Sequence, residues 1–121
     1  MSNIKSPLVT IGIPTYNRAK AYLKDAIKSA VDQTYPNIEI LISDNGSTDN
    51  TQLLVKSFDD PRIRYIKQEN NIGANNNFNY CVMNAKGDYF LLLHDDDLID
   101  KDFVEVCIHA AKFIPIHIVG R

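Results

Sequence analysis

Two spacings of hydrophobic residues alternate along this chain. Short apolar runs predict strands, and they occupy residues 8–13, 38–42, 63–66, 89–93 and 116–119. Between them, apolar residues recur at helical spacing in residues 23–31, 50–58, 78–85 and 103–111. Strands that alternate with helices in this way predict right-handed βαβ units. The expected fold is α/β, with a largely parallel sheet covered by helices on both faces.

Turn-forming and helix-breaking residues mark the boundaries of these elements. Pro14 ends the first strand, residues 43–47 (Ser-Asp-Asn-Gly-Ser) form a dense turn signal after the second, and Pro61 stands before the third. The third run alternates apolar and polar residues, which predicts an edge strand. We place Asp100 as the N-cap of the last helix, which ends before Pro115.

Three consecutive carboxylates, Asp95, Asp96 and Asp97, follow directly after the apolar run at residues 89–93. The run predicts a buried strand, and α/β proteins bind ligands beyond the carboxyl ends of their strands. Because adjacent carboxylates repel one another, the cluster indicates a nearby cation. A hard divalent ion, held together with the phosphate oxygens of a substrate, is the usual choice. A solvated acidic loop is the alternative interpretation.

Polar residues also follow the other strands, and parallel strands bring their carboxyl ends to one edge of a sheet. The first strand is followed by residues 14–18 (Pro-Thr-Tyr-Asn-Arg), the second by residues 44–49 (Asp-Asn-Gly-Ser-Thr-Asp), and the third by an Asn-rich stretch at residues 69–77. Together they predict an aromatic ring, amides and carboxylates on one rim. This combination suits a nucleotide, with the ring for the base and metal-binding carboxylates for the diphosphate.

Composition narrows the classes of protein. A chain of 121 residues with 45% hydrophobic and 23% charged residues is long enough for one core, and its net charge of −2 argues against disorder and against a polybasic nucleic-acid surface. It contains no apolar stretch of membrane-spanning length, and its first residues lack the apolar core of a signal peptide. Cys81 and Cys107 lie at apolar helical positions, so we expect both to be reduced core residues of a cytosolic protein.

With these residues placed, the chain resembles the family 2 inverting glycosyltransferases, which have the GT-A fold of nucleotide-diphospho-sugar transferases. The likeness is carried by residues 9–18 (VTIGIPTYNR), 29–51 (SAVDQTYPNIEILISDNGSTDNT), 71–73 (NIG) and 87–97 (GDYFLLLHDDD). It implies that residues 1–121 form the nucleotide-sugar-binding part of a glycosyltransferase domain, truncated after about the fifth strand. It also implies a divalent metal, Mn²⁺ or Mg²⁺, and inverting transfer of a sugar to an acceptor hydroxyl.

The resemblance assigns roles by position. Asp96 and Asp97 correspond to metal-binding positions of the family's Asp-x-Asp motif, and Asp44 to an aspartate that recognises the base. Asp44 can accept a hydrogen bond from the N3–H of uracil or thymine, so the expected donor is a UDP- or dTDP-sugar. The nucleotide-binding residues implied by position are Pro14, Thr15, Tyr16, Asn17, Asp44, Asn71, Gly73, Asn77 and Asp95.

Two departures from the family pattern affect these roles. His94 occupies the place where many relatives have the first aspartate of the motif. Residues 74–79 (ANNNFN) supply amides where many relatives carry an arginine that contacts the donor, and amides bring no positive charge. The individual roles of Asp95, Asp96 and Asp97 therefore stay open.

The resemblance also implies features beyond this chain. The catalytic base is expected to be a carboxylate beyond residue 121, so we expect the chain alone to be inactive. Because the last predicted strand, residues 116–119, ends almost at the C-terminus, we expect an exposed sheet edge and association as a homodimer or aggregate.

Partners and location follow from the same resemblance. The expected acceptor is a glycan, a lipid-linked compound or another hydroxyl compound, as in polysaccharide biosynthesis, with no nucleic-acid partner. We expect a cytoplasmic location, with peripheral attachment to the inner membrane open for a longer protein. A non-catalytic nucleotide- or protein-binding α/β module is the alternative function.

Overall fold

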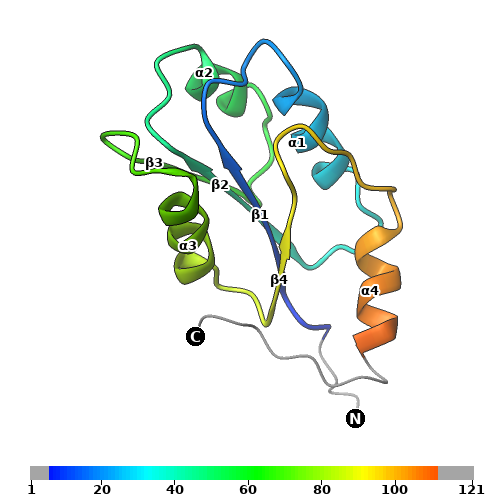
Figure 1. The fold of residues 1–121 in the computed structure, drawn as a ribbon. Helices are drawn as coiled ribbons and strands as arrows, with labels where there is room; N and C mark the ends of the chain where they lie inside the picture. Colours follow the sequence, from blue (N-terminus) through cyan, green and yellow to red (C-terminus); the bar gives the residue numbers. More distant parts are fainter. Residues whose placement is uncertain (1–5, 112–121) are drawn as a thin grey trace.

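Four parallel strands form the centre of the structure, a computed structural model that describes residues 6–111 (Figure 1). The elements follow one another as β1 (Val9–Thr15), α1 (Leu23–Val31), β2 (Ile38–Asp44), α2 (Thr51–Lys56), β3 (Ile63–Lys67), α3 (Ala74–Asn84), β4 (Tyr89–Leu92) and α4 (Phe103–Ala111). Within the sheet the order is β3-β2-β1-β4, and all neighbouring strands are parallel. The predicted α/β class is confirmed, and so is the edge position of the third strand in the described sheet.

The strands end at different levels, and this difference shapes the rim of the sheet. Thr15, the last residue of β1, pairs with Asp44, the last residue of β2. By contrast, the last residue of β4, Leu92, pairs with Gly12. The N–H of Leu93 still donates to the carbonyl oxygen of Gly12 (2.9 Å), and the chain then runs on beside the end of β1. The acidic residues that follow β4 are therefore brought against the loop after β1.

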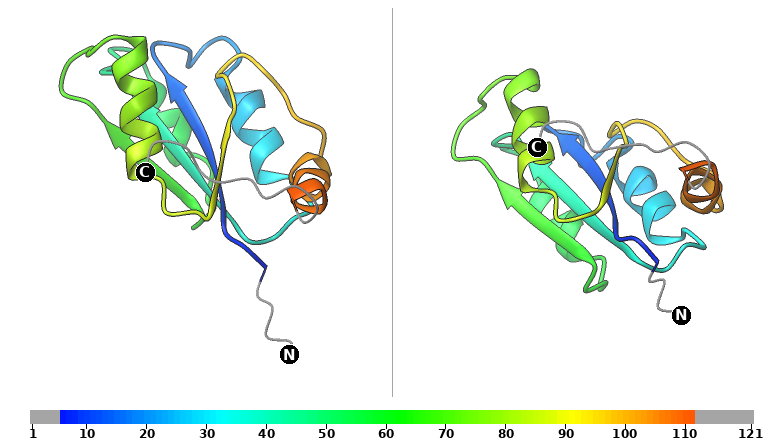
Figure 2. Two further views of the ribbon diagram at one scale, coloured as in Figure 1. Left: turned by 60° about the horizontal axis from the view of Figure 1, so that its bottom comes forward. Right: turned by 90° about the horizontal axis from the view of Figure 1, so that it is seen from below.

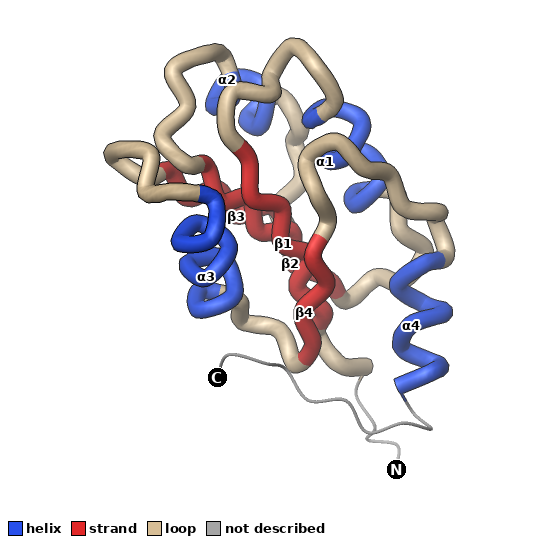
Figure 3. Tube along the Cα trace, in the orientation of Figure 1, coloured by secondary structure: helices blue, strands red, loops and turns tan. Residues whose placement is uncertain are grey.

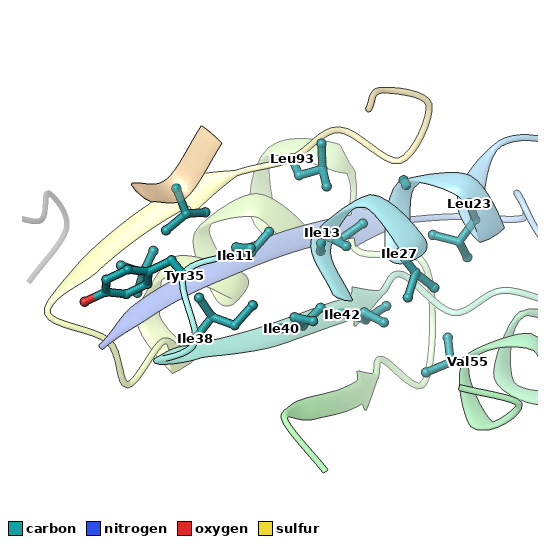
Figure 4. Packing of buried hydrophobic residues seen from close by; sticks show 14 of the residues in the cluster. Ile11, Ile13, Leu23, Ile27, Tyr35, Ile38, Ile40, Ile42, Val55 and Leu93 are labelled. Carbon is teal, nitrogen blue, oxygen red and sulfur yellow. The ribbon is translucent and has the colours of Figure 1, made fainter. Parts of the chain in front are cut away.

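Helices cover both faces of the sheet. Figure 2 shows α3 on one face and α1 on the other. The hydrophobic core lies on the α1 side, where isoleucines of β1 and β2 meet buried residues of α1, α2 and α4 (Figure 4). Val9, Ile11 and Ile13 of β1 all belong to this core because alternate residues of a strand point to the same face.

The face toward α3 carries a buried carboxylate network. Glu39 of β2 is 8% exposed, and its carboxylate accepts hydrogen bonds from Thr10 Oγ1 (2.6 Å), the N–H of Lys86 (2.7 Å) and Arg64 Nε (2.9 Å). Burial by itself would raise the pKa of Glu39, but these donors outweigh it and hold the pKa below its usual value. The ionised carboxylate therefore joins three strands to the loop that follows α3.

The last described helix differs from its prediction in two respects. It begins at Phe103, so Asp100 lies too far upstream to be the N-cap, and the N–H of Phe103 bonds the main-chain carbonyl oxygen of Asp100 instead (3.0 Å). Cys107 is exposed and is not a core residue, because the buried stripe of the helix runs through Val104 and Ile108.

Other predicted details were partly correct. Cys81 is buried as predicted, and burial raises the pKa of its thiol to about 12. β4 was expected to be fully buried, but all its residues are half-buried because it lies at an edge of the described sheet. α3 begins earlier than predicted, at Ala74, and ends before Ala85, whose backbone is extended. The predicted fifth strand at residues 116–119 lies outside the described residues.

None of the described helices has the length and apolar character needed to cross a membrane.

We expect Glu39→Gln to lower the free energy of unfolding by about 1.5–3 kcal/mol at pH 7, because hydrogen bonds to a charged group are lost or weakened. The folded-state pKa of Glu39 lies below the ordinary 4.5, so this stabilisation is present above pH 4.5 and is lost as the pH falls through the folded-state value. Urea unfolding of parent and variant at pH 7 and near pH 3 measures the difference, with the exposed Glu69→Gln as control. A parent–variant difference that is the same at both pH values would contradict this account.

Candidate functional site

A cleft of about 480 Å³ opens at the carboxyl ends of β1 and β4, beside the N-terminal half of α3. The loops that follow β1 and β4, coloured tan in Figure 3, border it. The lining residues are Pro14, Thr15, Tyr16, Arg18, Asn45, Ala74, Asn75, Asn77, Phe78, Leu92, His94 and Asp95. They come from segments far apart in the chain, so the cleft exists only once the parallel sheet has formed.

Asp95 joins the loop after β4 to the loop after β1. Its Oδ2 accepts a hydrogen bond from Thr15 Oγ1 (2.9 Å) and lies 3.7 Å from Arg18 Nε. The Asp95 side chain is 16% exposed, whereas that of Arg18 is 43% exposed. Arg18 is the only lysine or arginine among the described residues that line the cleft. The cleft therefore brings one guanidinium close to the acidic cluster.

Asn17 ties the loop after β1 to the loop after β2. Its φ of 53° lies in the left-handed region, which asparagine adopts more readily than most residues. Its N–H donates to Ser47 Oγ (2.8 Å), and its Oδ1 accepts from the N–H groups of Thr48 (2.8 Å) and Asp49 (3.3 Å). The side chain is thus bound to the neighbouring loop, and Asn17 does not line the cleft.

Asp44 is fully buried below the rim of the cleft. Its Oδ1 accepts a hydrogen bond from the N–H of Ser47 (2.9 Å), and its Oδ2 accepts one from the Tyr65 hydroxyl. Burial and this bond to the carboxylate raise the pKa of Tyr65 well above its usual range. Asp44 does not line the cleft, but its neighbour Asn45 does. Recognition of a base by Asp44 stays a prediction.

The Asn-rich stretch supports the cleft from a third loop. Asn45 Nδ2 donates to Asn71 Oδ1 (2.9 Å), and the N–H of Ile72 donates to Asn45 Oδ1 (2.8 Å). The N–H of Gly73 donates to the same Asn71 oxygen (2.8 Å), just before α3 begins. A Cβ atom at Gly46 would lie 2.9 Å from the Asn70 carbonyl carbon, so the two loops pack backbone to backbone. Asn71 and Gly73 thus shape the cleft without lining it.

Asn77 is the polar residue by which α3 attaches to the sheet next to the cleft. It is 2% exposed, and its amide exchanges two hydrogen bonds with Ser43 of β2. Ser43 Oγ donates to Asn77 Oδ1 (2.7 Å), and Asn77 Nδ2 donates to the Ser43 carbonyl oxygen (2.9 Å). Asn77 lines the cleft and also holds α3, one wall of the cleft, against the sheet.

The two residues predicted to bind metal, Asp96 and Asp97, are exposed and do not line the cleft. A main-chain bond from the N–H of Asp97 to the carbonyl oxygen of His94 (3.0 Å) closes a turn around them. Within residues 6–111, no three or more acidic, histidine or cysteine side chains converge on a point that could hold a metal ion. Carboxylates are nevertheless suitable donors for Mg²⁺ or Mn²⁺, which are usually held by one or two of them with substrate phosphate oxygens.

The structure brings together part of the predicted site. Five predicted residues line the cleft: Pro14, Thr15, Tyr16, Asn77 and Asp95. Sequence reasoning had placed Arg18, Asn45 and Asn75 at the rim without assigning them to the site, and it assigned Phe78 to an apolar helix face. Nothing in the sequence indicates that Phe78 reaches the cleft, because apolar helical spacing does not specify which neighbours the ring meets.

The chain belongs to glycosyl transferase family 2, whose family model matches residues 10–120. An uncharacterized glycosyltransferase of Rickettsia typhi is 45% identical over 103 residues, which cover 85% of this chain and 31% of that relative. The chain therefore spans about a third of the length of this relative.

Solved structures show the same fold at lower identity. The structure of Staphylococcus aureus TarS (residues 1–349) in complex with UDP-GlcNAc matches with a TM-score of 0.80 and 24% identity, over 87% of this chain and 31% of that one. A mannosyltransferase of Pyrobaculum calidifontis in complex with GDP-Man and Mn²⁺ matches with a TM-score of 0.76 and 22% identity, over 93% of this chain and 34% of that one. The predicted GT-A architecture is thus confirmed.

We expect Asn17→Ala to destabilise the chain by about 1–3 kcal/mol, because it loses the bonds to Thr48 and Asp49 and places an alanine at a left-handed backbone position. Asn17→Gly is the matched control, since it loses the same bonds but tolerates the backbone conformation. Urea unfolding should give the order parent, Gly variant, Ala variant, from most to least stable. If both variants are as stable as the parent, the hydrogen bonds between Asn17 and the loop after β2 do not contribute to the free energy of unfolding.

Proposed function

We propose that this chain binds a nucleoside-diphospho-sugar, a UDP- or dTDP-sugar, as the donor part of an inverting glycosyltransferase. The observation that supports it most is the shared lining of one cleft by an aromatic ring, a guanidinium and a carboxylate of the acidic cluster: Tyr16, Arg18 and Asp95. An aromatic ring can stack on a base, a guanidinium can pair with phosphate oxygens, and Asp95 stands beside the two carboxylates proposed to hold the metal. The solved structures of similar fold that contain UDP-GlcNAc or GDP-Man are consistent with this class of ligand.

The base is proposed to pack on the aromatic side of the cleft. Tyr16 is 42% exposed and Phe78 is 37% exposed, and both line the cleft. An exposed aromatic ring at a ligand site offers a stacking surface for a base. Asn45 lies in the same cleft, and its amide, which donates to Asn71 and accepts from Ile72, keeps one further donor and one further acceptor. We assign reading of the base edge to Asn45, with Asp44 holding the loop that carries it.

The diphosphate is proposed to lie between Arg18 and the acidic loop. Arg18 would compensate part of the phosphate charge, which matters because residues 74–79 supply amides and no cation. Asp96 and Asp97 would hold the divalent ion, and a bound ion would stabilise negative charge on the leaving diphosphate. Asp95 already accepts from Thr15, so it is proposed to orient the loop next to the ribose and phosphates.

The reaction follows from this arrangement of the donor. In an inverting transfer, the acceptor hydroxyl loses its proton to a general base and attacks the anomeric carbon from the face opposite the leaving diphosphate. The residues of this chain would bind and orient the donor so that this carbon faces away from the cleft wall. We propose that segments equivalent to the unmatched parts of the longer relatives supply the acceptor site and the general base.

We expect Asp96→Ala to lower the affinity for UDP in the presence of Mn²⁺ by at least roughly tenfold, with little change in the absence of metal. The reason is that Asp96 would be one of the carboxylates that hold the ion, and the ion would compensate part of the diphosphate charge. Isothermal titration calorimetry with UDP, with and without Mn²⁺, measures both affinities. Asp59→Ala, an exposed carboxylate near α2, is the control. If Asp96→Ala and the parent bind equally well with Mn²⁺, the acidic loop does not hold the metal.

We expect Tyr16→Ala to weaken UDP binding by about 1–3 kcal/mol, or roughly five- to 150-fold in Kd, because a base-stacking surface is removed. Tyr22→Ala is the matched control, since Tyr22 is a more exposed tyrosine, at 57%, that does not line the cleft. Competition between UDP and a fluorescent uridine nucleotide gives the affinities. Equal losses in the two variants would place the base elsewhere.

A further inference from the structure

Gln33, two residues after the end of α1, holds the segment that leads from the acidic loop to α4. Gln33 is 7% exposed, so its amide lies inside the protein. Its Nε2 donates to the carbonyl oxygens of Ser29 (3.0 Å) and Asp100 (2.7 Å), and its Oε1 accepts from the N–H of Val104 (2.9 Å). Both N–H groups and the oxygen of the buried amide therefore have partners, and the two distant partners are main-chain groups of residues 99–104.

Neighbouring residues strengthen the same attachment. Ser29 Oγ accepts a hydrogen bond from the N–H of Ile99 (3.3 Å), and the N–H of Thr34 donates to the carbonyl oxygen of Lys101 (2.7 Å). Figure 1 shows the chain between β4 and α4 passing beside α1, where these bonds form. The end of α1 thus carries a row of hydrogen bonds to residues 99–104.

These bonds anchor one end of the acidic loop, residues 94–98. The other end is anchored where the N–H of Leu93 donates to the carbonyl oxygen of Gly12. Three carboxylates lie between the two anchors, and their mutual repulsion favours spread-out conformations of the loop. Thr15 also holds Asp95 through its side chain, so the two anchors matter most for the position of Asp96 and Asp97 in the absence of a ligand.

We propose that Gln33 is a positioning residue for nucleotide binding: it anchors residues 99–104 and thereby holds Asp96 and Asp97 in place for a divalent ion and a diphosphate. This inference rests on the proposed function. Gln33 does not line the cleft, so its influence passes through the main chain at Asp100. A loop released from this anchor has more conformations in the free protein and loses more of them on binding, which lowers the affinity.

The test compares the parent with Gln33→Met, which keeps the length and burial of the side chain but removes all its hydrogen bonds. Calorimetry with UDP, with and without Mn²⁺, gives the factor by which Mn²⁺ increases the affinity. We expect this factor to fall by at least about threefold in the variant, while the metal-free affinity stays unchanged. Hydrogen exchange without any ligand should be faster at the main-chain amides of residues 99–104.

Thr10→Val is the matched control, because it removes buried hydrogen bonds to Glu39 and Gly87 on the other face of the sheet. It should lower stability and leave the Mn²⁺ factor unchanged. Ser29→Ala removes the acceptor for Ile99 and a bond within α1, from Ser29 Oγ to the Ala26 carbonyl oxygen, and it leaves the Gln33 amide intact. It serves as the milder variant if Gln33→Met does not fold, with a smaller fall of the factor expected.

Two failures of this test are distinguishable. A parent that binds UDP, together with an unchanged Mn²⁺ factor in the folded Gln33 or Ser29 variant, overturns the positioning role and leaves the proposed function intact. A parent that binds no UDP contradicts the proposed function itself. In that case, hydrogen exchange still tests the anchor: if exchange at residues 99–104 is the same in parent and variant, Gln33 does not hold this segment.

Discussion

The pairing of β1 with β4 is the constraint on which the candidate site depends. Because β4 ends opposite Gly12, the residues after it continue along the last part of β1 instead of turning away at the rim. This places Asp95 close to Arg18 and within hydrogen-bond distance of Thr15. Thr15 and Asp95 are 80 residues apart in the sequence. A shift of the pairing by one residue would reverse the faces of β4 and move the acidic loop away from the aromatic and basic residues of the cleft.

The carboxylates of this chain divide into two groups by their surroundings. Glu39 and Asp44 are buried and accept hydrogen bonds from neighbouring strands and loops, so they hold the framework in place. Asp96 and Asp97 are exposed and stand on a loop whose ends are anchored by main-chain bonds. Carboxylates that already have their full set of partners are poorly suited to bind a metal, whereas those without such partners remain available for one.

The strands and the rim of the site followed closely from the sequence. The apolar runs at residues 8–13 and 38–42 agree with β1 and β2 to within two residues at either end, because short β-branched runs bounded by turn residues leave few alternatives. Burial of individual side chains was less predictable. Cys107 shares its helical spacing with buried residues yet is exposed, because a helix at the border of the core buries only a narrow stripe.

The sequence by itself determined the order of the elements, the parallel sheet and the collection of polar residues at its carboxyl edge, since each of these depends on local patterns and on the handedness of βαβ units. Only the tertiary structure decided which of those residues line the cleft. Asn17 bonds the loop after β2, Asp44 bonds its own loop and Tyr65 of β3, and Phe78 comes to the cleft from α3. The bond from Ser47 to Asp44 is local, but Tyr65 lies 21 residues from Asp44 and Thr48 lies 31 residues from Asn17. Nothing in the sequence near Asn17 or Asp44 specifies these distant partners, because they meet only when parallel strands end side by side.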